Sequence, residues 1–163
     1  MASHDAVGRL YPENFGSFAL GSARVSVAAT GNAVVAIPIL SGGLSNSGNT
    51  ATSGSVIIRR VTVQNPNVDV SAANIAISIA STGNVAAANA VVANVVLSNL
   101  SAVGRWQDLT VAGAFGANTT VSGNSTSALF VNVNTAVTGG AVDIKVYGDV
   151  VSAYAVRNQY ELQ

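Results

Sequence analysis

Residues 128–151 read ALFVNVNTAVTGGAVDIKVYGDVV. Apolar and polar side chains alternate on both sides of the Thr-Gly-Gly sequence at 138–140, and alternation with period two is typical of strands that bury one face. Glycine at that point favours a tight turn. The stretch therefore predicts a β-hairpin with strands at 128–134 and 141–151. The face expected to be buried in the second strand consists of Val142, Ile144 and Val146.

Similar alternation recurs upstream, interrupted by turns rich in Gly, Asn and Pro. The further strands that it predicts span residues 23–28, 33–40, 55–64, 73–80, 91–98 and 105–112. The segment before 98 is Ala-rich at its start, but Asn94 and its β-branched neighbours disfavour a helix. Pro38 lies inside a predicted strand, which is compatible with an edge position. We predict an all-β chain: a single antiparallel β-sandwich or jelly roll of about eight strands.

The two ends of the chain differ from its middle. Residues 1–17 show no period and are predicted to form an extended N-terminal arm, residues 18–151 the sandwich, and residues 152–163 a C-terminal tail. Five of the nine aromatic residues lie near these ends: Tyr11, Phe15, Phe18, Tyr154 and Tyr160. Because termini fray unless they are held, and aromatic residues supply much of the energy of interfaces, we expect these residues to dock onto neighbouring subunits. The alternative is that both arms fold back onto their own sandwich.

Charge is scarce, at 9% of the 163 residues, against about 25% in an average soluble domain. The seven basic and seven acidic residues cancel, which argues against a nucleic-acid groove or a patch for anionic membranes. No run reaches the roughly 18 apolar residues of a membrane helix, and the N-terminus lacks the apolar core of a signal peptide. With 49% apolar residues, the composition indicates a surface that neighbours cover. We expect an assembly component, with a secreted β-domain as the alternative.

The sequence contains no motif for catalysis or metal binding. Cysteine is absent and the single histidine, His4, lies in the N-terminal arm, so neither a zinc site nor a Ser-His-Asp triad is predicted. The seven acidic residues are scattered and form no calcium loop. Two distant carboxylates could still meet in the fold, as they do in glycosidases. We expect no catalytic residue, no cofactor and no enzyme activity.

Two arginines interrupt the apolar strand predicted at 55–64. Period two places them on opposite faces, Arg60 together with Ile58 and Arg59 together with Val61. One arginine is therefore expected on the buried face, where it needs a carboxylate of this chain or of a neighbour at a subunit boundary. The alternative is a side chain that extends past the rim of the core. The acids considered as partners are Asp69, Asp108, Asp143 and Asp149.

Trp106 lies in the sequence Arg-Trp-Gln-Asp at 105–108. It either packs in the core or at an edge of the sandwich, or it forms an interface hot spot. A surface that binds sugars would need exposed aromatic rings beside polar side chains. The candidates for such rings in the middle of the chain are Trp106, Phe115 and Tyr147.

Three stretches resemble strands of small virion proteins of tailed bacteriophages: SVIIRRVTVQNP at 55–66, ANIAISIA at 73–80 and LFVNVNTAVTGGAVDIKVYGDVV at 129–151. The likeness is one of pattern and composition, and it carries over no site residues. It implies a β-rich module that binds the outside of the major capsid lattice, commonly as a homotrimer at local symmetry axes. Such proteins decorate or cement the capsid.

From these observations we expect a non-enzymatic structural protein at the capsid surface of a virion, of the decoration or cement type. Its partners would be the major capsid protein and further copies of itself, with no nucleic acid and no membrane. The residues expected at interfaces are Tyr11, Phe15, Phe18, Arg59, Arg60, Trp106, Tyr154 and Tyr160. The alternatives are a phage tail or fibre component and a carbohydrate-binding or adhesin-like sandwich.

Overall fold

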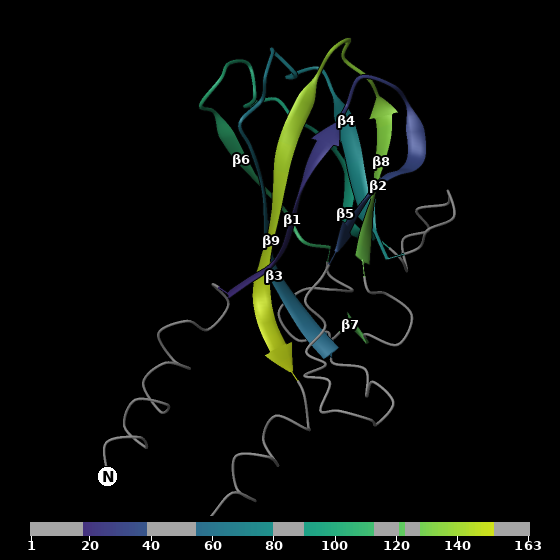
Figure 1. Ribbon diagram of the computed structural model, residues 1–163, viewed down its shortest axis with the longest axis vertical. Coiled ribbons are helices and arrows are strands. Elements are labelled where there is room, and N and C mark those ends of the chain that lie inside the picture. Colours follow the sequence, from purple (N-terminus) through teal and green to yellow (C-terminus); the bar gives the residue numbers. More distant parts are fainter. Residues whose placement is uncertain (1–17, 39–54, 80–89, 113–120, 123–127, 152–163) are drawn as a thin grey trace, which may run out of the picture.

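The computed structural model describes residues 18–38, 55–79, 90–112, 121–122 and 128–151. These residues form nine strands and no helix, arranged as two antiparallel sheets that face each other (Figure 1). The predicted all-β sandwich is therefore confirmed. In this part of the chain, no helix is long and apolar enough to cross a membrane. The arms predicted at 1–17 and 152–163 lie outside the described residues.

The larger sheet has the strand order β1-β9-β3-β6. Its strands are β1 (Phe18–Ser26), β9 (Ala141–Val151), β3 (Ser55–Gln64) and β6 (Trp106–Leu109). The two-residue β7 (Val121–Ser122), which the sequence did not predict, pairs with the first residues of β3. β3 and β9 have their predicted ranges, because both are long runs rich in β-branched residues. β1 begins earlier than the predicted strand at 23–28.

The smaller sheet has the strand order β2-β8-β4-β5. Its strands are β2 (Gly31–Pro38), β8 (Ala128–Thr135), β4 (Asn74–Ser78) and β5 (Ala90–Val96). β2 lies at an edge, as Pro38 predicted, because proline has no amide hydrogen to offer a further strand. The Ala-rich segment forms the strand β5, so its interpretation as a strand is confirmed. The β-hairpin predicted from 128–134 and 141–151 is wrong: β8 pairs with β2 and β4, whereas β9 pairs with β1 and β3, so the turn between them connects the two sheets.

The core lies between the two sheets and consists of aliphatic side chains. Val142, Ile144 and Val146 of β9 are fully buried, as their alternation predicted. From the smaller sheet, the same core includes Ile75, Ile77, Leu129 and Val131. Burying one such side chain contributes about 1.5–3 kcal/mol, so this shared layer supplies the main stabilisation of the fold.

A β-bulge flanks β9 on each side, at the same level of the sheet. In β1, Leu20 is the extra residue beside Tyr147. In β3, Arg59 is the extra residue beside the same tyrosine. A bulge sets two residues of one strand against one of its partner, so the alternation of side chains restarts with the opposite parity. This is why Ile58 and Val61 are both buried, although they are three positions apart.

The bulge in β3 makes the period-two prediction for the two arginines wrong. Arg60 lies on the outer face of the sheet together with Thr62 and Gln64. Ile58, which the prediction grouped with Arg60, points into the core. Arg59 is half-buried and does not belong to the core cluster. Neither arginine therefore lies on the buried apolar face. Arg59 is the extra residue of the bulge, and after it the side chains alternate with the opposite parity.

Gly148 lies next to Tyr147 in β9, at the level of both bulges. A Cβ atom at this position would overlap the backbone carbonyl oxygen of Ile57 and would lie 2.9 Å from Cδ1 of Leu20. The carbonyl belongs to the paired strand β3 and cannot rotate away as a flexible side chain could. The absence of a side chain at position 148 is therefore what lets β9 and β3 approach each other there.

We predict that Gly148→Ala lowers the free energy of unfolding by at least about 2 kcal/mol, because the added methyl group displaces the backbone of β3. Urea denaturation followed by circular dichroism measures the change. Ser22→Ala, at an exposed position of β1, serves as the control and should change stability by less than about 0.5 kcal/mol. A Gly148→Ala variant as stable as the wild type would contradict this register of β3 and β9.

Candidate functional site

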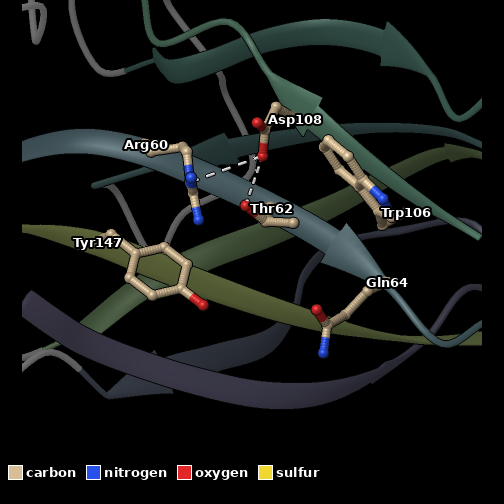
Figure 2. A pocket seen from close by; sticks show the side chains of 6 residues that line it. All are labelled: Arg60, Thr62, Gln64, Trp106, Asp108 and Tyr147. Carbon is tan, nitrogen blue, oxygen red and sulfur yellow. Dashed lines mark hydrogen bonds and ion pairs between the residues drawn. The ribbon is translucent and has the colours of Figure 1, made fainter. Parts of the chain in front are cut away.

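A shallow, open depression of about 310 Å³ lies on the outer face of the larger sheet. Figure 2 shows the six side chains around it, which come from three neighbouring strands. They are Arg60, Thr62 and Gln64 of β3, Trp106 and Asp108 of β6, and Tyr147 of β9. Because alternate residues of a strand share a face, this spacing gathers polar side chains into rows on one surface.

Asp108 is the centre of the polar contacts in this depression. Its Oδ1 accepts a hydrogen bond from Thr62 Oγ1 at 2.6 Å. The same oxygen forms an ion pair with Arg60, whose Nε lies 3.7 Å away. The contacts follow from the register of the sheet, since Thr62 and Asp108 are direct partners in β3 and β6. Thr62 is only 6% exposed, so its hydroxyl fixes the carboxylate from the floor of the depression.

Arg60 connects this carboxylate to an aromatic ring of β9. Its guanidinium carbon lies 4.7 Å from the centroid of the Tyr147 ring, which is a cation–π contact. The two residues are paired across the strands at the bulge. At exposed sites a cation–π contact contributes about 0.5–1 kcal/mol and an ion pair about 0–1 kcal/mol, so both contacts mainly orient the guanidinium group.

Trp106 lines the side of the depression opposite Tyr147 (Figure 2). It is 60% exposed, so it is not a core residue, whereas its predicted alternative position at an edge of the sandwich is confirmed by its place on the edge strand β6. β6 is held by Gln107, whose Nε2 donates to the Val96 carbonyl and whose Oε1 accepts from the Asn99 amide, both at 3.1 Å. These bonds tie the short edge strand to the end of β5 and thereby fix the position of Trp106.

Two of the predicted interface residues, Arg60 and Trp106, meet in the depression. Arg60 pairs with a carboxylate of its own chain, Asp108, which was among the acids considered from the sequence. Phe18 is the first residue of β1. The remaining aromatic residues predicted at interfaces lie outside the described residues: Tyr11, Phe15, Tyr154 and Tyr160.

The sequence did not identify Thr62 and Gln64 as site residues. Period two alone already groups Thr62 and Gln64 with Arg60, because the bulge precedes all three, but it does not show that their face of β3 is the outer one. Which residues of β6 stand opposite them depends on the pairing of strands that are far apart in the chain. Phe115, the third aromatic candidate for a sugar-binding surface, lies outside the described residues.

A second charged cluster joins β1, β9 and the turn after β3. Asp143 Oδ1 accepts a hydrogen bond from Arg24 Nη1, and Asp143 Oδ2 accepts one from Asn65 Nδ2, both at 2.9 Å. Arg24 Nη1 also donates to the carbonyl oxygen of Asn65 at 2.7 Å. Asn65 has a φ of 52°, a left-handed conformation that asparagine adopts more readily than most residues. The hydrogen bonds from Asn65 and Arg24 lower the pKa of Asp143 from its ordinary value of 3.8.

The smaller sheet differs from the larger one in charge. Its strands β2, β4, β5 and β8 contain no Asp, Glu, Lys or Arg. The strands of the larger sheet contain Arg24, Arg59, Arg60, Asp108, Asp143, Lys145 and Asp149. On the outer surface of the smaller sheet, Asn134 Nδ2 donates to Asn94 Oδ1 at 2.9 Å and to Asn74 Oδ1 at 3.3 Å. This asparagine cluster lies beside Val96, the partner of Asn74, and the surface that it forms is neutral.

In chemical terms the depression offers donors, acceptors and an aromatic ring for binding. Of its six lining residues one is a carboxylate. Within the described residues, no group of three or more His, Cys, Asp or Glu side chains is placed to hold a metal ion. No protein-family model matches the chain, and neither the curated proteins nor the solved structures contain a significant match to it.

We predict that Asp143→Asn lowers stability at neutral pH by less than about 1 kcal/mol, because the cluster is partly exposed. The pKa of Asp143 is lower in the folded chain, so its stabilisation is complete above the ordinary pKa and is lost as the pH falls through the folded value. The difference in unfolding free energy between wild type and variant should therefore shrink below about pH 3.8.

Urea denaturation at a series of pH values measures this difference. Val103→Ala, at a position that is 75% exposed, is the control, and its effect should not change with pH. If the difference in unfolding free energy between wild type and Asp143→Asn stays constant through the acid range, the carboxylate is not held by Asn65 and Arg24.

Proposed function

We propose that the sandwich is a jelly roll and that the chain is a non-enzymatic structural protein of a virion. The strand pairs are nested along the chain: β1 with β9, β2 with β8, β3 with β6, and β4 with β5. Successive pairs alternate between the two sheets. A long antiparallel hairpin that is rolled up has this order, and the jelly roll is frequent in viral capsid and lectin domains. The nesting supports the proposal at the level of the fold.

The role that fits best is that of a decoration or cement protein, bound to the outer surface of a phage capsid. The observation that carries this role is the separation of charge between the sheets. A neutral surface can be buried against another protein without removing ions from water, which is costly. The centres of protein interfaces are correspondingly depleted in charged residues. Ala76, Ser78 and Asn132 of this sheet are buried, whereas Asn94, Val96 and Asn134 are exposed. We therefore assign the exposed part of the smaller sheet around the asparagine cluster to the contact with the major capsid protein.

We predict that the isolated chain is a homotrimer. The low content of charge and the high content of apolar residues favour self-association, and threefold symmetry is one of the common closed symmetries. Sedimentation velocity at micromolar concentration measures the assembly state. A stable monomer under these conditions would contradict this part of the proposal.

We predict that the chain sediments with capsids assembled from the major capsid protein that the same genome encodes. Asn94→Lys places a charge in the asparagine cluster and should weaken this binding by about tenfold or more, because the ammonium group must be desolvated or the contact must open. The fraction of chain that sediments with a fixed amount of capsid, measured against chain concentration, gives the affinity.

Val103→Lys adds the same charge at an exposed position outside both sheets and is the matched control. It should bind capsids as the wild type does, and thermal unfolding should show that both variants are folded. The capsid assignment fails if the wild type does not sediment with capsids, or if it binds purified tails or fibres instead. Equal weakening by both lysines would place the contact elsewhere on the chain.

A further inference from the structure

The depression between β9, β3 and β6 has hydrogen-bonding groups that the described part of the chain leaves unused. Oδ1 of Asp108 is occupied by Thr62 and Arg60, whereas Oδ2 has no donor among the described residues. In the same part of the chain, the side-chain amide of Gln64 makes no hydrogen bond. Arg60 approaches the carboxylate to 3.7 Å, which is an ion pair but no hydrogen bond, so within the described residues its N–H groups make no hydrogen bond. The depression therefore offers a ligand both hydrogen-bond acceptors and hydrogen-bond donors.

Trp106 adds an aromatic surface to these polar groups. Trp106 is 60% exposed, and the register of β6 places it directly opposite Gln64. Figure 2 shows its ring at one side of the depression, with Thr62 and Asp108 between it and Tyr147. Ligand sites in proteins combine aromatic surface with a few convergent polar groups in this way.

The charge of the depression selects the class of ligand. Arg60 and Asp108 cancel each other, so no net positive charge is present among the lining residues to attract a phosphate or a carboxylate. An anionic ligand would instead meet Oδ2 of Asp108, an acceptor that cannot donate a hydrogen bond to it. A neutral molecule with several hydroxyl groups can donate to that oxygen and to the amide oxygen of Gln64 while it accepts from Arg60.

We propose that this depression binds an uncharged pyranose, a neutral hexose unit of a glycan. One face of such a ring carries only C–H groups and can stack on the indole of Trp106. Its rim carries hydroxyl groups, of which two neighbours donate to Oδ2 of Asp108 and to the amide oxygen of Gln64. Arg60, held in place by Tyr147, donates to a third hydroxyl or to the ring oxygen.

The size of the depression sets the scale of this binding. A volume of about 310 Å³ lies at the lower end of the about 300–1,000 Å³ that ligand pockets occupy, so one or two sugar units fit and the rest of the glycan remains in water. Because the site is open, the affinity for a single sugar is expected to be millimolar. The site binds without cleaving, since hydrolysis of a glycosidic bond uses two carboxylates and the depression has one. The proposal does not depend on a role in a virion.

The experiment begins with the full chain on an array of neutral, sialylated and sulfated glycans. Methyl glycosides of glucose, galactose, mannose and N-acetylglucosamine are then titrated into the chain. Trp106 is the only tryptophan, so its fluorescence reports directly on the depression. We expect binding to neutral glycans on the array and a saturable change in Trp106 emission with at least one glycoside.

Variants then locate the site. Trp106→Ala and Asp108→Asn should each weaken binding by about tenfold or more, as measured by saturation-transfer NMR, which needs no tryptophan. Trp106→Phe keeps a ring that can stack and should retain part of the affinity. Val103→Ser, an exposed position outside the depression, should bind as the wild type does. Thermal unfolding confirms that each variant is folded.

Three results would overturn the proposal. The first is the absence of binding to any glycan on the array and to all four glycosides. The second is binding confined to sialylated or sulfated glycans, since the depression is proposed for an uncharged ring. The third is sugar binding that Trp106→Ala and Asp108→Asn leave unchanged. Weakened capsid binding by these two variants, without any sugar binding, would reassign the depression to a protein contact.

Discussion

The position of β9 between β1 and β3 is the constraint on which the rest of the structure depends. β9 is paired on both sides, and its even-numbered residues from Val142 to Val146 fill the core. Its odd-numbered residues face outward, with Asp143 at one end and Tyr147 near the other. Once β9 is placed, the register fixes Arg60 beside Tyr147, and β3 in turn fixes Asp108. The core and the depression are therefore two sides of the same set of strand pairings.

The bulge at Arg59 connects these two sides physically. Without the extra residue, Ile58 and Val61 could not both point inward, because residues three apart in a regular strand face opposite ways. The same extra residue brings Arg60 to the outer face, where it reaches both an aromatic ring and a carboxylate. A local irregularity thus keeps the core aliphatic and also assembles the polar side of the depression.

Local alternation was enough to predict the class of the fold and several of its elements. The strands at 55–64, 128–134 and 141–151 could be predicted because each is a run rich in β-branched residues. The pairing of the last two as a hairpin was wrong, because the turn after β8 carries the chain from one sheet to the other. Pro38 identified an edge because its chemistry forbids one particular hydrogen bond. The bulge at Arg59 was missed, since a bulge is defined by the partner strand and leaves no mark in the alternation except the adjacent arginines. Trp106, Tyr147 and Arg60 were each singled out from the sequence. Their common position around one depression could not be predicted, because it depends on which strands pair.

The division of charge between the two sheets has a consequence for how each surface responds to its surroundings. Dissolved salt screens charged groups over about 10 Å at 0.1 M and over shorter distances at higher concentration. A contact formed through the smaller sheet has no charges within its strands to screen, and it should hold equally well in dilute buffer and in brine. Contacts through the larger sheet involve ion pairs such as that of Arg24 with Asp143, and they should change with ionic strength. The strength of contacts through the smaller sheet should therefore be independent of ionic strength, and that of contacts through the larger sheet should depend on it.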